Sequence, residues 1–224
     1  MKAPNVLLDL DGTLTDPREG IVGCFRFALT RLNVTCPNDA ELARFIGPPL
    51  RESIEQLLPS ANQALREEAL TLFRTRFSST GMFENFVYPG ITSALTTLLD
   101  SGARLFVVTS KPQVFAKRIV EHFGLDHYFS AVHGSELGGA LSSKGALIAH
   151  ALKSEGLEPS GTIMVGDRAH DVLGAHANDV QTVGVLWGYG SREELAAAGA
   201  TYLCEHPAEL GKVAADHDRR FRLK

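Results

Sequence analysis

The sequence has no apolar run of membrane-spanning length, and it contains little cysteine. Its 224 residues include only three cysteines, Cys24, Cys36 and Cys204, and no two of them have Cys-x-x-Cys spacing. This pattern favours buried reduced thiols over a disulfide framework or a structural zinc site. The chain turns acidic at Asp9, too early for a secretory leader, so we expect a cytoplasmic protein with no membrane partner.

A strong charge of either sign is also missing. The formal net charge is -4, which provides no overall basic field, so nucleic acid is disfavoured as a partner and a small molecule is expected instead. Internal repeats and low-complexity segments are absent, and 44% hydrophobic with 21% charged residues describes an ordinary globular protein. A monomer and a homodimer both remain open.

Short apolar and β-branched runs indicate the strands of a parallel sheet. Four of them span residues 6–10, 104–109, 162–165 and 181–185, and a fifth strand is expected at 131–133. Continuous apolar strands that alternate with helices are typical of a doubly wound parallel sheet covered on both faces. We therefore predict an α/β, Rossmann-like core with five strands.

Almost one hundred residues separate the first two predicted strands, far more than one crossover helix needs. Helical patterns cover most of this stretch, at residues 21–32, 39–45, 51–58 and 62–77. The sequence therefore predicts a small α-helical cap inserted into the core. We place the core domain at 1–15 and 83–224, and the helical cap domain at 16–82.

Two aspartates, Asp9 and Asp11, end the first predicted strand and are followed by Gly12. Alternation along a strand points both side chains to the same side, at the carboxyl end where open α/β sheets bind ligands. Two carboxylates this close repel each other unless a cation or a shared proton relieves them. Mg²⁺, which prefers oxygen ligands, is the indicated ion. The alternative is a polar turn shaped by Gly12.

Thr109 and Ser110 end the second long strand with two hydroxyls that could donate hydrogen bonds to a phosphate oxygen. Ser110 is also expected to begin a helix, whose free backbone amides favour an anion. The alternative is that the pair serves only as a helix N-cap.

A lysine and two more aspartates complete the pattern. Lys144 is expected to begin an apolar-patterned helix, where a cation opposes the helix dipole, so an anionic partner would explain its position. Lys111 is a competitor for the same role. Asp167 and Asp171 follow a buried strand four residues apart, which would stack them on one helix face. A solvated lysine and capping acids are the alternatives for each segment alone.

Together these segments resemble the four motifs of the haloacid dehalogenase superfamily, in the expected order. Residues 9–13 read DLDGT, Thr109 and Lys144 match the second and third motifs, and residues 166–171 read GDRAHD. The helical insert after the first motif and the stretch FIGPPL at 45–50 are similar to the phosphoglycolate phosphatase-like branch. The resemblance covers nearly the whole chain and implies the core-and-cap fold described above.

The resemblance also implies a mechanism and a cofactor. Asp9 is expected to attack phosphorus and form an aspartyl-phosphate, while Asp11 protonates the leaving alkoxide and later activates water. The implied cofactor is Mg²⁺, with Asp9, the backbone carbonyl of Asp11 and Asp167 as ligands. Asp171 is expected in its outer coordination sphere.

The phosphoryl oxygens would be stabilised by several groups. By the resemblance these are Thr109, Lys144 and the backbone amides around Ser110 and Gly12. The cap would close over the site, exclude water and select the leaving group. Residues 47–49 and Arg51 are the candidates to face the substrate, although a proline-stiffened connection explains the same stretch.

The substrate expected from these features is a small, phosphoglycolate-like phosphate monoester. A 5'-nucleotidase acting on nucleoside monophosphates and a β-phosphoglucomutase-like phosphotransferase stay open as alternatives. A phosphate-binding regulatory module without turnover is the non-enzymatic alternative. A halide-releasing dehalogenase is disfavoured, because it has no use for Asp11 or for a metal-binding Asp167.

Overall fold

A parallel sheet forms the centre of the protein. The computed structural model describes residues 4–138, 141 and 143–212 of the chain. Within them, six strands pair in the order β5-β4-β1-β6-β7-β8, and every neighbouring pair is parallel. The strands are β1 (Asn5–Leu8), β4 (Arg104–Pro112), β5 (Ala131–Ser135), β6 (Thr162–Gly166), β7 (Gln181–Val185) and β8 (Tyr202–Cys204). The predicted α/β, Rossmann-like fold is confirmed.

The prediction of five strands is wrong, because β8 adds a sixth at the edge of the sheet. This strand is only three residues long and pairs with β7 alone, through Tyr202 to Cys204. A three-residue segment followed by Glu205 and His206 has no apolar run that distinguishes it from a loop.

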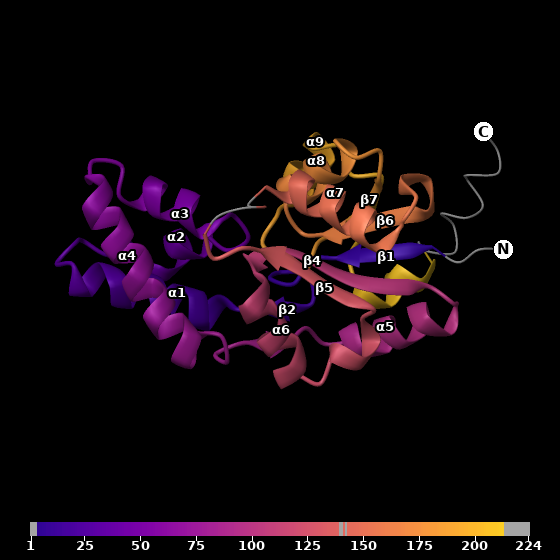
Figure 1. Cartoon of the computed structure of the whole chain (residues 1–224), viewed down its shortest axis with the longest axis horizontal. Coiled ribbons are helices and arrows are strands. Elements are labelled where there is room, and N and C mark those ends of the chain that lie inside the picture. The colour runs from indigo at the N-terminus through magenta and orange to yellow at the C-terminus, as the bar shows by residue number, and fades with distance from the viewer. Residues whose placement is uncertain (1–3, 139–140, 142, 213–224) are drawn as a thin grey trace.

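Helices cover both faces of the sheet (Figure 1). On one face lie α7 (Lys144–Glu155) and α8 (Ala169–His176), with α9 (Arg192–Ala197) beside α8, and on the other lie α5 (Ile91–Asp100) and α6 (Gln113–His122). Alternation along β1 serves both layers: Leu7 belongs to the cluster with α7 and α8, while Val6 and Leu8 belong to the cluster with α5 and α6. Short 3-10 turns occupy Asp126–Tyr128, Pro159–Gly161 and Pro207–Glu209.

The first four helices after β1 form a separate layer at one end of the molecule (Figure 1). They are α1 (Arg18–Arg31), α2 (Asp39–Ala43), α3 (Leu50–Leu57) and α4 (Gln63–Arg76), and a π-helical turn, η1 (Phe77–Gly81), continues α4. Local sequence sets their starts: Asn38 and Glu41 form a reciprocal capping box on α2, and Asn62 caps α4. We call residues 16–82 the cap, following the sequence-based division.

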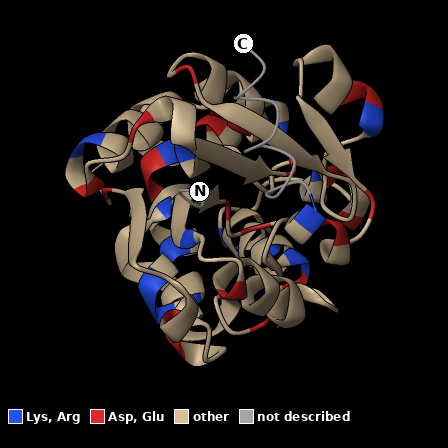
Figure 2. Ribbon diagram, turned by 90° about the vertical axis from the view of Figure 1, so that its right-hand side faces the viewer, with Lys and Arg blue, Asp and Glu red and all other residues tan. Residues whose placement is uncertain are grey.

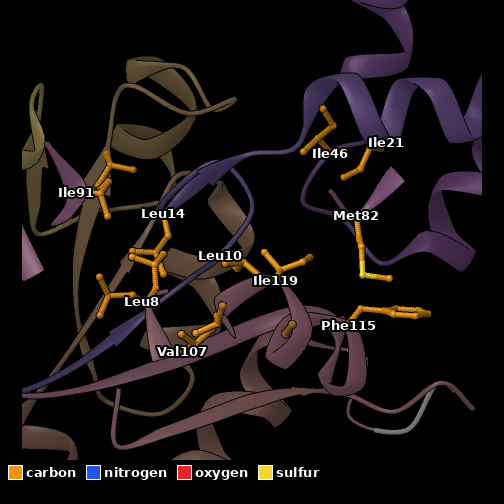
Figure 3. Close-up of a cluster of buried hydrophobic side chains, with 14 of the residues drawn as sticks. Leu8, Leu10, Leu14, Ile21, Ile46, Met82, Ile91, Val107, Phe115 and Ile119 are labelled. Atoms are coloured by element: carbon orange, nitrogen blue, oxygen red, sulfur yellow. The ribbon is translucent and has the colours of Figure 1, made fainter. Parts of the chain in front are cut away.

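The chain leaves and re-enters the core through two adjacent segments. These are the two-residue strands β2 (Thr15–Asp16) and β3 (Phe86–Val87), which pair antiparallel. A single hydrophobic cluster then continues from the sheet into the cap (Figure 3). In that view Leu8 and Val107 lie on the sheet, while Ile21, Ile46 and Met82 lie toward the cap helices. The carboxyl ends of β1 and β4 therefore lie under a cap that packs firmly on the core.

Candidate active site

Lys144 lies at the centre of a buried ionic cluster. It is the first residue of α7, whose N-cap Ser143 accepts a hydrogen bond from the Ala146 amide. Its Nζ is 2.9 Å from Asp9 Oδ1 and 2.8 Å from Asp171 Oδ1, and it also donates to the Val108 carbonyl at 3.0 Å. A lysine at the start of a helix was expected to have an anionic partner. Lys144 has two, the carboxylates of Asp9 and Asp171, which come from distant parts of the chain.

The acids of this cluster carry more negative charge than Lys144 balances. Burial raises the pKa of Asp9, and the attraction of Lys144 offsets this effect only in part. Burial, together with repulsion from Asp171 and Asp9, raises the pKa of Asp167 well above its usual range. Burial alone would raise the pKa of Asp171 too, but Lys144 and His170 bring it below its ordinary value. Two carboxylates share one ammonium, and a third, Asp167, is repelled by both of them, so the cluster favours a further cation.

Asp167 follows β6 and packs against the turn after β1. Thr13 Oγ1 donates to its Oδ1 at 3.4 Å, and the Tyr189 amide donates to its Oδ2 at 2.8 Å. Gly12 has φ +85°, and a Cβ at this position would lie 2.2 Å from Asp167 Oδ2. Glycine is therefore required at position 12 both for the backbone conformation and for the room that Asp167 occupies.

Two contributors to the site were missed in the sequence analysis. Ligand atoms of His170, Asp9 and Asp171 lie within 4.8 Å of one another, which makes the histidine part of the acidic cluster. The turn after β7 also reaches the site, because the Tyr189 amide binds Asp167 and Trp187 Nε1 donates to the Thr13 carbonyl at 2.9 Å. The glycine-spaced WGYG stretch directly after a buried strand was the available signal for this turn.

Asp11 lies beside a second lysine rather than beside Lys144. Lys111 Nζ is 2.7 Å from Asp11 Oδ2, and both side chains are at least nine-tenths buried. The same ammonium lies 4.4 Å from the centre of the Phe77 ring of the cap, within cation–π distance. Lys111 therefore contacts the expected acid/base on one side and the cap on the other. The two lysines, which the sequence made competitors for one role, thus pair with different aspartates: Lys144 with Asp9 and Asp171, and Lys111 with Asp11.

Thr109 is buried within β4, which continues to Pro112, so the predictions that this strand ends at Thr109 and that Ser110 begins a helix are both wrong. Ser110 lies within β4, and α6 begins only at Gln113, after Pro112 at the N-cap. Proline disfavours helical backbone in the residue before it, so Lys111 stays extended and the helix starts later. The Ser110 hydroxyl is buried and has no hydrogen-bond partner within the described part of the chain.

A cavity of about 210 Å³ lies between the cap and the carboxyl ends of β1 and β4. From the core it is lined by Asp11, Thr109, Ser110 and Lys111, and from the cap by residues 47–51. Arg51 therefore reaches the cavity wall, but its guanidinium also pairs with Glu67 across the cap surface. The rest of the wall includes five phenylalanines, namely Phe25, Phe45, Phe73, Phe77 and Phe115, together with polar residues such as Glu52 and Glu136.

The structure thus gathers most of the candidate residues at one rim of the sheet. Asp9, Lys144, Asp167 and Asp171 form the ionic cluster, and Asp11, Thr109 and Ser110 line the adjoining cavity. The catalytic and binding roles assigned to them stay predictions.

Comparison with known proteins agrees with this fold. Residues 6–185 match the family model of haloacid dehalogenase-like hydrolases. A 5'-nucleotidase of Pseudomonas aeruginosa is 46% identical, with 97% of this chain and 98% of the relative covered. A phosphoglycolate phosphatase of Colwellia psychrerythraea is 26% identical, with coverage of 85% and 87%. The crystal structure of a predicted phosphatase from Clostridium acetobutylicum superposes with a TM-score of 0.92 and 41% identity, covering 96% of this chain and all of that one.

The chain belongs to the haloacid dehalogenase-like hydrolases and is an enzyme of their phosphatase group, as its sequence motifs predict.

Across the described ranges, no helix combines the length and hydrophobicity needed to cross a membrane. Acidic and basic residues are interspersed over the ribbon (Figure 2).

Proposed function

We propose that this enzyme hydrolyses a small phosphate monoester through a phosphorylated Asp9, with Mg²⁺ as cofactor. One observation supports this most directly: a buried lysine pairs with Asp9 and Asp171 beside a cavity that Asp11 lines. A nucleophile, a cationic group for phosphoryl oxygens and a separate acid/base are the parts that phosphoryl transfer through an enzyme aspartate requires.

In the proposed mechanism, Asp9 attacks phosphorus and the bond to the leaving alkoxide breaks. Asp11 gives its proton to that alkoxide and then takes a proton from the water that hydrolyses the aspartyl-phosphate. Lys144 favours the charged form of the Asp9 carboxylate and orients it, because their atoms are 2.9 Å apart. Thr109 and the unpartnered Ser110 hydroxyl supply donors for the phosphoryl oxygens.

The residues at this rim fit Mg²⁺. The raised pKa values of Asp9 and Asp167 mark carboxylates whose negative charge is not compensated, and oxygen donors suit a hard divalent ion. Asp9, Asp167 and the Asp11 carbonyl would hold the ion, with Asp171 and His170 beside them. When bound, Mg²⁺ would neutralise charge on the phosphoryl group during transfer.

Mg²⁺ is expected to raise the melting temperature of the protein. At about 100 times its dissociation constant, a ligand that binds only the folded state adds about 2.7 kcal/mol of stability, which corresponds to roughly 5–10 °C for a chain of this size. Thermal unfolding with Mg²⁺ or with EDTA measures the shift. The same Mg²⁺ concentration should move Asp167→Asn by less than about 2 °C. An equal shift in this variant would argue against Asp167 as a ligand.

The cavity supports a nucleoside 5'-monophosphate over phosphoglycolate as the substrate. Phe45, the one phenylalanine of the wall that is only half-buried, can contact the flat face of a nucleobase, whereas glycolate offers two carbons and a carboxylate. The relative with 46% identity is a 5'-nucleotidase, which supports the same choice. Phosphoglycolate stays the second candidate, because its hydrolases are also relatives.

Phe45→Ala is expected to lower kcat/KM for nucleoside monophosphates by about fivefold or more, since stacking on a base is worth about 1–3 kcal/mol. Phe45 lines the cavity and packs edge-on against Phe25, with ring centres 6.0 Å apart. Hydrolysis of acetyl phosphate, which has no ring, should change by less than about threefold because no stacking is lost. Phosphate release from the nucleotide and from acetyl phosphate is the measurement.

Phe27→Ala is the matched control, because Phe27 lies on α1 and does not line the cavity. Equal losses on nucleotide and acetyl phosphate in Phe45→Ala would count against base stacking. A wild-type preference for phosphoglycolate over every nucleotide would favour the second candidate.

A further inference from the structure

We infer that Arg168 is a positioning residue that fastens the substrate-facing turn of the cap to the loop carrying Asp167. Arg168 directly follows Asp167 and precedes α8. Its guanidinium Nη1 donates to the Ile46 carbonyl at 2.8 Å, across 122 sequence positions. The acceptor belongs to the cap and the donor to the core, so this hydrogen bond joins the two parts beside the catalytic rim.

The core end of this connection is rigidly held. Arg168 Nε donates to Glu194 Oε1 at 2.9 Å, and the same oxygen accepts from the Ala169 amide at 2.8 Å. The Arg168 amide in turn donates to Asp171 Oδ2 at 3.1 Å. One arginine therefore contacts an acid of the ionic cluster through its backbone and the cap through its side chain. The guanidinium itself donates to both Glu194 and the Ile46 carbonyl, and its fixed donor geometry suits these two contacts better than a lysine would.

The cap end meets the core at close range. Gly47 has φ +104°, and a Cβ there would lie 3.2 Å from Arg168 Cγ and 3.3 Å from His170 Cε1. The next residues, 48–51, line the cavity together with Gly47. The segment that Arg168 holds is therefore the one that would face the leaving group of a bound ester. Losing the hydrogen bond would leave Asp9 in place but loosen the cavity wall.

Arg168→Lys and Arg168→Ala provide the test, and the lysine variant keeps the charge and the aliphatic stem if the alanine variant folds poorly. Arg192→Ala is the matched control, since Arg192 begins α9 and pairs with the exposed Glu205 on the surface. Two substrates separate the effects: p-nitrophenyl phosphate, an ester whose leaving group is a ring, and acetyl phosphate, an acyl phosphate whose leaving group is small. Amide hydrogen exchange of residues 46–53 is measured on the same proteins without substrate.

For both Arg168 variants, KM for p-nitrophenyl phosphate is expected to rise about tenfold, as loss of one charge-assisted hydrogen bond allows. Their kcat on acetyl phosphate should stay within about twofold, because Asp9 and Lys144 are untouched. Exchange in residues 46–53 should become faster in these variants and not in Arg192→Ala. Equal loss of kcat on both substrates, or unchanged exchange in residues 46–53, would overturn the inference.

The kinetic part rests on the proposed phosphatase mechanism, and the exchange measurement does not. Absence of turnover by the wild-type enzyme on any ester would count against that mechanism, while unchanged exchange in the variants would count against Arg168 alone. The two failures are therefore distinguishable.

Discussion

Replacing Asp9 with asparagine is expected to lower kcat by at least about 10⁴-fold, because the amide nitrogen cannot attack phosphorus and no neighbouring group replaces it. Asp11 Oδ2 pairs with Lys111 at 2.7 Å, and the carboxylate of Asp171 pairs with Lys144 and accepts from the Arg168 amide. Phosphate release from p-nitrophenyl phosphate in the presence of Mg²⁺ measures the loss.

A second measurement on this variant separates a lost nucleophile from a damaged site. Substrate carrying a labelled phosphoryl group should label the acid-quenched wild-type protein and leave Asp9→Asn unlabelled. Mg²⁺ should still raise its melting temperature in part, since Asp167 and the Asp11 carbonyl are retained. Asp100→Asn, an exposed change at the end of α5, is the control and should behave as wild type. Full activity in Asp9→Asn would refute the proposed nucleophile.

Lys144→Met is expected to reduce both stability and turnover. The substitution removes the ammonium between Asp9 and Asp171, and all three side chains are at most 3% exposed. Removing one partner of a buried ion pair costs about 3–5 kcal/mol, because the remaining charge stays buried without compensation. Loss of the cationic group that we propose to stabilise the phosphoryl oxygens is expected to lower kcat by a further 10²–10³-fold in order of magnitude. Urea unfolding and steady-state kinetics measure the two effects.

The same exchange at Lys153, an exposed position near the end of α7, should change stability by less than about 0.5 kcal/mol. The double variant Lys144→Met/Asp171→Asn should regain part of the lost stability, because one of the stranded carboxylates is then neutral. No recovery in the double variant would mean that the loss comes from packing rather than from charge.

The sequence predicted the central strands well, because their signal is local. β7 was predicted with the bounds that it has, Gln181–Val185, since a buried parallel strand is a continuous apolar run. β1 was predicted to extend to Leu10 but ends at Leu8. Leu10 is buried like a strand residue, yet its carbonyl accepts hydrogen bonds from Leu14 and Thr15, so it belongs to a turn. Apolar pattern reports burial, and it does not distinguish a strand from a buried turn.

The site was predictable as a set of residue types and not as a set of contacts. Aspartates at strand ends and a lysine at a helix start can be recognised in the sequence, but the pairing of Lys144 with Asp9 and of Lys111 with Asp11 depends on how distant segments meet. The Tyr189 amide, which binds Asp167, is a backbone group, so the WGYG glycines indicate a turn there but not this contact. The contact of Arg168 with the Ile46 carbonyl was invisible for the same reason.

The hydrophobic cluster that continues from the sheet into the cap helices has a consequence for protein engineering (Figure 3). Ile21 and Met82 of the inserted segment share this cluster with Phe115 of α6. Excising the insert would therefore expose hydrophobic side chains on the remaining core domain. A chimaera that takes its cap from a relative must therefore also take the core residues that share this hydrophobic cluster with the cap helices.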